Sequence, residues 1–165
     1  MSRWDLHSAT TAEWPEIAAL LTASGLPLAG AEDHLADFVV ARQDSVFVGC
    51  ACLERYGRFG LLRSVAVEPG IQASGLGQAL VSHVLVQADQ DGLDAVALLT
   101  TTAASYFPRF GFHVVDRAEI PAQVHVSVEF REACPESAIA MLRVAGSRVD
   151  SAISEPAGIA PQMPR

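Results

Sequence analysis

A short glycine-rich turn that opens directly into a helix is the feature that most restricts the fold of this chain. The turn, Gln72-Ala73-Ser74-Gly75-Leu76-Gly77, follows a β-branched run that stops at Pro69-Gly70, and apolar residues then repeat at helical spacing to about Asp91. Glycines at the start of a helix leave its backbone N–H groups unobstructed, which creates a cradle for an anion. An alternative is that the glycines serve only the backbone angles of a strand-to-helix turn.

The turn differs from both common nucleotide-binding motifs. It is too short for a P-loop and lacks the Lys-Ser/Thr ending of that motif. It also lacks three glycines at the spacing of the dinucleotide fingerprint. Neither motif therefore explains the turn.

Strands and helices surround the turn in an order that predicts an α/β fold. Gly57-Arg58 is the kind of two-residue connection that suits a tight antiparallel hairpin. Residues 146–165 are rich in Ser, Ala, Pro and Gly without periodicity, so we expect one domain over residues 1–145 and a tail of low order. Period and composition predict further helices over residues 12–24 and 103–109, and strands over residues 38–42, 45–56, 59–68, 95–99, 112–116 and 138–143.

The two-residue connection also fixes which residues of the hairpin lie opposite each other. It pairs Glu54 with Leu61, and directly opposed residues share a face of a sheet. Alternation along the second strand then puts Arg63, Val65 and Val67 on that face as well. We therefore expect the carboxylate of Glu54 and the guanidinium of Arg63 to lie together, either in a binding site or as a structural ion pair.

Composition narrows the classes of protein. The chain has 165 residues and a formal net charge of −8, and all 11 of its basic residues are Arg. A chain of this length forms one ordinary domain with a real core, and its acidic balance argues against nucleic-acid binding. The longest apolar run, about residues 46–53, is far shorter than the roughly 20 residues of a membrane helix. Three cysteines without disulfide spacing and the absence of a signal peptide predict a reduced, cytoplasmic protein. The acidic charge balance fits a protein that handles a small ligand in one local pocket.

No metal is expected from the sequence. The five histidines show no zinc-type spacing. Cys50 and Cys52 lie two apart on one strand face, and soft thiolates bind trivalent arsenic in principle. Small buried apolar side chains are the simpler interpretation of both cysteines.

Three motifs in a fixed order give the chain a resemblance to a known family. They are Ser64-Val65-Ala66-Val67-Glu68-Pro69, the turn from Gln72 to Gly77, and the aromatic stretch from Phe107 to Phe112. These motifs resemble the fourth strand, the pyrophosphate loop and the aromatic motif at the acetyl-CoA site of the GNAT superfamily of N-acetyltransferases. The resemblance extends over about residues 3–143. It implies the GNAT fold, a mixed, mostly antiparallel and splayed sheet flanked by helices.

The resemblance implies a binding site for acetyl-CoA as the cosubstrate. Backbone groups of Val65 and Val67 are expected to bond the pantetheine arm, and N–H groups from Ala73 to Gln78 are expected to hold the pyrophosphate. Dipoles at the helix end supply the field, so that an acidic chain without Lys still binds a polyanion. The implied acetyl-CoA residues are Val65, Val67, Gln72, Ala73, Ser74, Gly75, Leu76, Gly77, Gln78 and Phe107.

Two finer resemblances indicate the acceptor. Residues 98–102 and Gly111-Phe112 resemble the acetyltransferase domain of N-acetylglutamate synthases. Glu119-Ile120-Pro121, Glu129-Phe130-Arg131 and residues 134–138 resemble the arsenic-resistance N-acetyltransferases. Enzymes related to this second group acetylate arsinothricin, a glutamate analogue, or phosphinothricin. Both resemblances imply the α-amine of a small acidic amino acid.

The sequence departs from these families at three positions. Phe107 stands where many members have the Tyr that protonates the leaving thiolate, and Leu61 stands where the synthases have a Glu as general base. Pro135 replaces a substrate-binding Arg two residues before Ser137. The resemblance leaves Thr100, at the end of the fifth strand, as the hydroxyl that serves as acid.

Glu54 is the replacement base that the hairpin geometry offers. It lies opposite Leu61 in the predicted register, so it occupies the neighbourhood of the missing Glu and acts directly or through a water molecule. Arg63 then holds a carboxylate of the substrate. Further candidates for substrate binding are Thr101, Arg131 and Ser137.

The sequence thus predicts an acetyl-CoA-dependent N-acetyltransferase whose acceptor is a small acidic amino acid. If that acceptor is arsinothricin or phosphinothricin, the enzyme acts in arsenic resistance. Acetylation of glutamate in arginine biosynthesis is the alternative among enzymes. A non-catalytic module that binds acyl-CoA or responds to a metalloid is the alternative of another class, because the usual Tyr and Glu are missing. The expected partner is the small-molecule substrate, with no nucleic acid and no membrane, and the resemblance allows a homodimer.

Overall fold

The structure is a computed structural model that describes residues 3–133 and 137–146. The predicted tail from residue 147 onward lies outside these residues, and so do Cys134 and Pro135. Within the described part, the two α-helices are α1 (Trp14–Ala23) and α2 (Leu76–Gln90). The strands are β1 (Asp5–Ser8), β2 (Phe38–Gln43), β3 (Val46–Tyr56), β4 (Phe59–Val67), β5 (Ala95–Thr100), β6 (His113–Val115) and β7 (Ile139–Val144).

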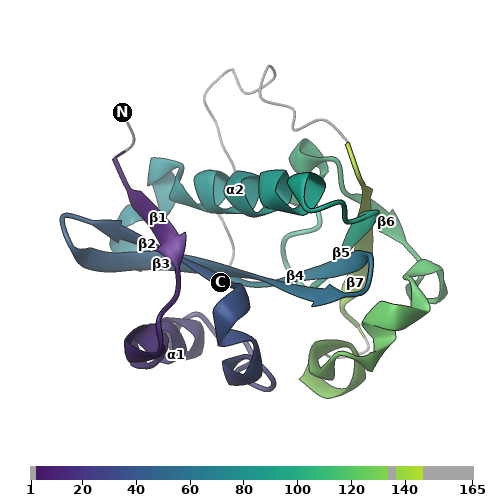
Figure 1. Cartoon of the computed structure of the whole chain (residues 1–165), viewed down its shortest axis with the longest axis horizontal. Coiled ribbons are helices and arrows are strands. Elements are labelled where there is room, and N and C mark those ends of the chain that lie inside the picture. Colours follow the sequence, from purple (N-terminus) through teal and green to yellow (C-terminus); the bar gives the residue numbers. More distant parts are fainter. Residues whose placement is uncertain (1–2, 134–136, 147–165) are drawn as a thin grey trace.

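The described strands form one seven-stranded sheet in the order β1-β2-β3-β4-β5-β7-β6. β4 and β5 are parallel, whereas every other neighbouring pair is antiparallel. Figure 1 shows α2 on one side of this sheet and α1 on the other. The predicted α/β class with a mixed, mostly antiparallel sheet flanked by helices is therefore confirmed.

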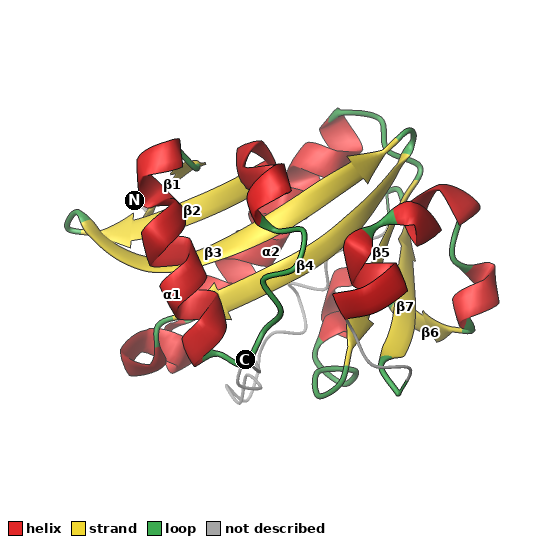
Figure 2. Cartoon of the chain, turned by 90° about the horizontal axis from the view of Figure 1, so that it is seen from below, coloured by secondary structure: helices red, strands yellow, loops and turns green. Residues whose placement is uncertain are grey.

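The parallel pair β4 and β5 holds together over a short distance only. Residues 59–61 of β4 pair with residues 95–97 of β5, and the two strands then continue to Val67 and Thr100 without further pairs. Figure 2 shows that β1 to β4 and β5 to β7 run in different directions. The predicted splay is confirmed, and it leaves one edge of β4 open over residues 62–67.

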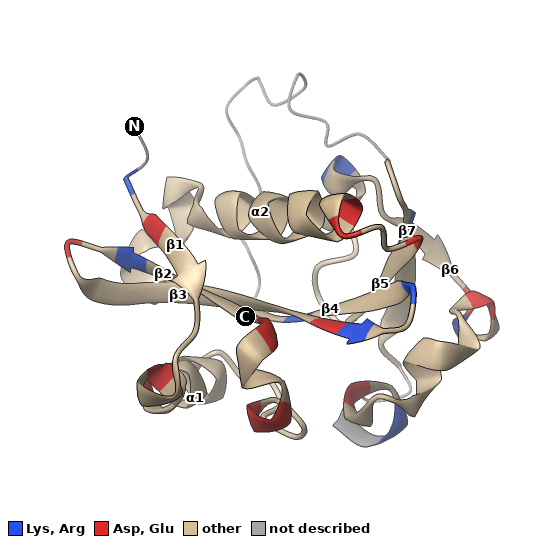
Figure 3. Cartoon of the chain, viewed as in Figure 1, with Lys and Arg blue, Asp and Glu red and all other residues tan. Residues whose placement is uncertain are grey.

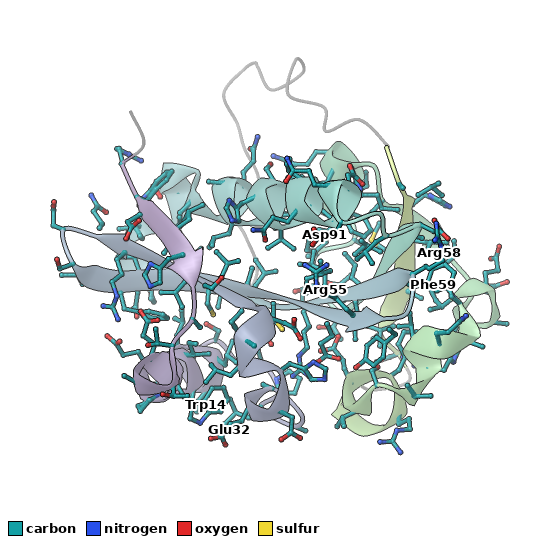
Figure 4. All side chains as sticks on the ribbon, viewed as in Figure 1. Trp14, Glu32, Arg55, Arg58, Phe59 and Asp91 are labelled. Atoms are coloured by element: carbon teal, nitrogen blue, oxygen red, sulfur yellow. The ribbon has the colours of Figure 1, made fainter. Side chains whose placement is uncertain are left out.

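The hairpin of β3 and β4 has the predicted register. Gly57 adopts a φ of 65°, as a tight two-residue turn requires, and Glu54 lies opposite Leu61. Arg55 and Asp91 form an ion pair at 2.8 Å that ties the hairpin to the end of α2, and both side chains are labelled in Figure 4. The turn geometry and this contact fix where Glu54 stands in the sheet.

The predicted alternation along β4 is wrong beyond Arg63. The register with β3 shifts next to Ser64, which adopts a φ of 58°, so β4 carries one extra residue at this point. Such a β-bulge reverses the faces of the residues that follow it. Val65 and Val67 therefore pack into the core beneath α2, whereas Arg63 contacts Glu54 on the opposite side of the sheet.

The buried apolar residues form three groups. Leu80 and Leu85 of α2 pack on one face of the sheet, and Ile17 and Leu21 of α1 pack on the other. A third group surrounds Leu61, beneath the short helical turns that follow β6. This third group borders the place where β4 and β5 separate, so the short turns form one side of any site on that face.

The predicted helix over residues 103–109 is wrong in type and extent. A single 3-10 turn forms at Phe107–Phe110, and Gly111 ends it with a φ of 96°. Pro108 has no N–H to donate to the preceding turn, so an α-helix does not continue through it. β1 was not predicted either, because four residues are too few to show a strand period.

Candidate functional site

The glycine-rich turn forms the start of α2 as predicted. A 3-10 segment, Pro69–Ser74, leads to Gly75, which adopts a φ of 93° just before the first residue of the helix. A Cβ on Gly75 would meet no atom within 4 Å, so the space in front of the turn is open. Backbone N–H groups in the first turn of a helix have no partner within the helix, and they carry its positive dipole end. This arrangement suits an anion.

The charges around the glycine-rich turn also favour an anionic ligand. Figure 3 shows no acidic residue on α2 before its last turn, where Asp89 lies. Arg3 donates from Nη2 to the carbonyl of Ser74 at 3.0 Å, and its guanidinium lies over the ring of Trp4. No periodicity or motif in the sequence singles out Arg3 as a neighbour of this turn.

The open edge of β4 ends beside the same turn. Glu68 donates its N–H to the carbonyl of Val48, so the intervening Val67 directs its own N–H and carbonyl away from β3. The carbonyl of Val67 accepts a hydrogen bond of 3.3 Å from the side chain of Gln72. The edge and the turn are therefore joined, and an extended ligand can follow both.

Aromatic side chains lie on the α2 side of the sheet. Phe107 packs edge-on against Tyr106 and Phe112, with ring centroids 5.4 and 5.8 Å apart, and all three are buried. Burial raises the pKa of Tyr106 to about 12. Thr100 lies at the end of β5, where its hydroxyl accepts a hydrogen bond of 2.9 Å from the N–H of Ala103.

A buried ion pair lies on the other side of the sheet. Nη1 of Arg63 donates to Oε2 of Glu54 at 3.1 Å, and the side chains are 0% and 1% exposed. Tyr56 donates its hydroxyl to Oε1 of Glu54. Both oxygens of this carboxylate are therefore engaged.

The guanidinium of Arg63 is a junction between segments that are far apart in the sequence. It donates to the carbonyls of Pro27 and Ala29 at 3.1 and 2.9 Å, in the loop after α1. Its Nε donates to the hydroxyl of Ser64 at 3.0 Å. Nη1 and Nη2 thus bond the loop after α1, and Nε bonds the bulge residue of β4. Because each nitrogen of the guanidinium donates a hydrogen bond, Arg63 holds the loop against the bulge.

Glu129 is a second buried carboxyl beside Arg63. It lies at the start of the π-helical segment Glu129–Ala133, is 4% exposed, and has Oε1 3.4 Å from Nε of Arg63. Burial and the charge of Glu54 raise the pKa of Glu129 to about 7, although Arg63 acts in the opposite direction. The resemblance to arsenic-resistance enzymes includes Glu129-Phe130-Arg131 but gives Glu129 no role, and no periodicity marks it because the chain around it forms irregular turns.

His34 connects Glu54 to the surface. Its Nε2 lies 3.7 Å from Oε1 of Glu54, and its Nδ1 lies 3.1 Å from Asp37. The side chains of His34 and Asp37 are 27% and 28% exposed. The buried carboxylate therefore has a polar neighbour that reaches solvent.

The remaining predicted substrate residues lie outside this buried group. Thr101, Arg131 and Ser137 are exposed, and none of them contacts Glu54 or Arg63. Cys50 and Cys52 are fully buried, and burial raises the pKa of both thiols, which disfavours thiolate chemistry. Among the described residues, no three His, Cys, Asp or Glu side chains gather as metal ligands. In that same part of the chain, no helix is both long and apolar enough to span a bilayer.

Comparison with known protein families agrees with this geometry. Residues 34–114, which run from the loop before β2 to β6, match the model of the acetyltransferase (GNAT) domain. The chain has a GNAT acetyltransferase domain. The turn at the start of α2 and the open edge of β4 both lie within the matched part of the GNAT domain.

Sequence relatives of the GNAT domain carry the name amino-acid acetyltransferase. The Neisseria meningitidis serogroup A protein is 28% identical over 125 residues, which are 70% of this chain and 29% of that protein. The Escherichia coli K12 protein is 30% identical over 92 residues, which are 54% of this chain and 21% of that protein. The chain thus matches less than a third of the length of these relatives.

Solved structures share the fold of the GNAT domain. N-acetylglutamate synthase from Neisseria gonorrhoeae, complexed with coenzyme A and N-acetyl-glutamate, superimposes with a TM-score of 0.75 at 24% identity, over 87% of this chain and 35% of that one. Rv2747 from Mycobacterium tuberculosis, in complex with CoA and NLQ, gives a TM-score of 0.72 at 24% identity, over 85% and 98% of the two chains. These likenesses establish the GNAT fold.

Proposed function

We propose that this chain transfers the acetyl group of acetyl-CoA to the amine of a small amino acid. The GNAT domain and relatives named amino-acid acetyltransferases support the reaction. Neighbours solved with coenzyme A support acetyl-CoA as the cosubstrate. One observation carries the proposal: the open edge of β4 leads directly to the glycine turn at the start of α2.

The pantetheine arm of acetyl-CoA suits the open edge of β4. We expect backbone groups of Val65 and Val67 to bond its amides as a neighbouring strand would, since Val67 directs its N–H and carbonyl to this edge. The pyrophosphate then meets the N–H groups from Ala73 to Gln78 and the positive end of α2. Arg3 adds a positive side chain beside the turn.

The bulge in β4 provides a place for the thioester. We expect the N–H of Val65 to polarise the thioester carbonyl, because the strand is unpaired beyond Leu61. Phe107 packs in the core on the α2 side, and Thr100 is the hydroxyl predicted to protonate the leaving thiolate. Glu54 is the proton acceptor predicted from the sequence, although both of its oxygens accept hydrogen bonds in the structure.

The acceptor is an amino acid with a second negative group. The likeness to N-acetylglutamate synthase, solved with N-acetyl-glutamate, favours glutamate, whereas the sequence resemblance to arsenic-resistance enzymes favours arsinothricin or phosphinothricin. Arg63 directs its donors at protein oxygens, so the exposed side chains Thr101, Arg131 and Ser137 are better placed to hold the carboxylate of the acceptor.

The proposal is tested by release of free coenzyme A thiol from acetyl-CoA. Glutamate, aspartate, phosphinothricin and arsinothricin are supplied in turn, with a sample that lacks acceptor as the blank. We expect turnover with glutamate or with one of its two analogues, and the acetylated amine is identified by mass spectrometry. Preference for glutamate supports the biosynthetic acceptor, and preference for an analogue supports detoxification.

A negative result separates the alternatives. If acetyl-CoA binds in calorimetry but no acceptor releases thiol, either the proposed class of acceptor is wrong or the chain is a non-catalytic module that binds acyl-CoA. If acetyl-CoA does not bind, the assignment of the β4 edge and the turn is wrong as well.

A further inference from the structure

Glu54 is poorly suited to accept a proton in this structure. Arg63 donates to one of its oxygens and Tyr56 donates to the other. Each carboxylate oxygen already accepts a hydrogen bond from the protein and the side chain is 1% exposed, so an acceptor amine has little access to it. The same two contacts make Glu54 a strong anchor for Arg63.

Glu129, unlike Glu54, is a buried carboxyl that accepts no hydrogen bond from the described residues. The residue is 4% exposed, and in the described part of the chain its carboxyl pairs with Nε of Arg63 at 3.4 Å. That Nε donates to the hydroxyl of Ser64 at 3.0 Å, so Glu129 accepts no hydrogen bond from it in the usual range. Buried polar groups in folded proteins nearly always have a hydrogen-bond partner, and the residues that the structure describes give the Glu129 carboxyl an ion pair but no hydrogen bond. The carboxyl therefore has room for one more donor, and the amine of a bound acceptor is such a donor.

The position of Glu129 identifies that donor. Arg63 links Glu129 to Ser64, and Ser64 is the bulge residue in the part of β4 that is no longer paired with β5. Val65, which is expected to polarise the thioester, is the next residue. An amine placed to attack the thioester from this face would therefore lie beside the carboxyl of Glu129.

We propose that Glu129 takes the proton from the ammonium group of the acceptor, and that Glu54 holds Arg63 in position for this step. The inference rests on the proposed acetyl transfer and names a residue for it. In the reaction, the ammonium gives one proton to the carboxylate of Glu129, and the neutral amine forms the C–N bond with the thioester carbon. The C–S bond then breaks, the second amine proton goes to the thiolate to give coenzyme A thiol, and Glu129 releases its proton to solvent.

The charges around Glu129 match this role. Arg63 faces it from β4, and Glu54 faces it from β3 with Tyr56 and His34 behind. The ring of His125, on the preceding turn, stacks on Phe130 and bonds the carbonyl of Ile120 instead. With a pKa of about 7, Glu129 is ionised in much of the protein at neutral pH, and it binds a proton more readily than an ordinary Glu does.

The test is the pH dependence of kcat/KM for the wild type and for Glu129→Gln, Glu129→Asp and Glu54→Gln. We expect the wild-type rate to fall in acid with an apparent pKa near 7. Glu129→Gln should lower kcat by about 10²–10⁴-fold and remove this acid limb. Glu129→Asp keeps a carboxyl and should keep the limb at a reduced rate. Glu54→Gln should lower the rate but retain the limb.

Glu32→Gln is the matched control, because Glu32 is an exposed acid at the start of the 3-10 turn before β2, where Figure 4 labels it. Circular dichroism checks that each variant is folded. If Glu129→Gln retains the acid limb or loses less than about threefold in kcat, the inference is overturned while the proposed function stands. If Glu54→Gln removes the limb and Glu129→Gln does not, Glu54 is the base. If the wild type transfers acetyl to no acceptor, the proposed function and this inference both fail.

Discussion

Arg143 donates to both carboxylate oxygens of Asp89 at 3.1 Å, and the pair joins the last turn of α2 to β7. The guanidinium also donates from Nε to the carbonyl of Phe110 at 2.9 Å, although Arg143 is only 2% exposed. One buried side chain therefore fixes α2, β7 and the aromatic turn in their relative positions.

We expect Arg143→Ala to lower the free energy of unfolding by about 3 kcal/mol, because it removes a large buried side chain and leaves Asp89 without its cation. Urea denaturation measures the change. Arg58→Ala is the control, since Arg58 pairs with Asp94 at the surface and should contribute little. Equal stability of the two variants would contradict the prediction.

Glu13 should make the protein sensitive to acid. Burial alone would raise the pKa of Glu13, but hydrogen bonds from His7, Thr10 and Arg42 lower it to about 2. The folded pKa lies below the ordinary value of 4.5, so this stabilisation is complete above pH 4.5 and is lost as the pH falls toward 2. Glu13→Gln should remove on the order of 3 kcal/mol at pH 7 and flatten the loss of stability between these pH values. Thermal melts across this range test it.

Glu129 should have the reverse effect on stability. Its pKa of about 7 lies above the ordinary value of 4.5, so the folded state binds this proton more tightly than the unfolded state does. The stabilisation is complete below pH 4.5 and is lost as the pH rises through 7. Glu129→Gln does not titrate, so its stability relative to the wild type should rise over this range by on the order of 3 kcal/mol. A constant difference across the range would show that Glu129 titrates normally.

The bulge in β4 depends on the backbone of Ser64. Its φ of 58° is costly for a β-branched residue and easy for glycine. Ser64→Val and Ser64→Gly both remove the hydroxyl that Arg63 contacts, so the difference between them reports the backbone conformation together with the fit of the Val side chain, and not the lost hydrogen bond. We expect Ser64→Val to be less stable than Ser64→Gly by about 1–3 kcal/mol in urea denaturation. Similar stabilities would mean that the bulge relaxes when the residue changes.

Gly75 should control the affinity for acetyl-CoA. A Cβ there would enter the open space in front of the turn, and the φ of 93° is unfavourable for alanine. We expect Gly75→Ala to weaken acetyl-CoA binding about tenfold, or about 1.4 kcal/mol, in calorimetry. Gly70→Ala is the matched control, because Gly70 is also open but lacks the left-handed φ. A similar loss for both variants would remove Gly75 from the phosphate site.

The sequence predicted those parts of the site that local geometry determines. A two-residue turn at Gly57-Arg58 leaves one register for the hairpin, and Glu54 indeed lies opposite Leu61 and contacts Arg63. The glycine turn before α2 was predictable for the same reason, since its residues are contiguous.

The sequence did not predict what depends on distant segments. The extra residue at Ser64 breaks the two-residue period without leaving a signal in composition, so Val65 and Val67 were placed on the wrong face. The bonds from Arg63 to the carbonyls of Pro27 and Ala29 involve backbone atoms, which no residue pattern reveals. Glu129 reaches Arg63 through irregular turns that have no period.

The separation of β4 from β5 has a consequence for the lifetime of the protein. In the described structure, only three residue pairs of the strand ladder join β4 to β5, and thus the β1-to-β4 part of the sheet to the β5-to-β7 part. If the pantetheine arm of acetyl-CoA pairs with the open edge of β4, bound acetyl-CoA stabilises the folded sheet at this point. Binding then lowers the population of molecules in which β4 and β5 have separated by local unfolding. Resistance to proteolysis would then follow the supply of acetyl-CoA, so that the abundance of the protein would track the metabolic state of the cell.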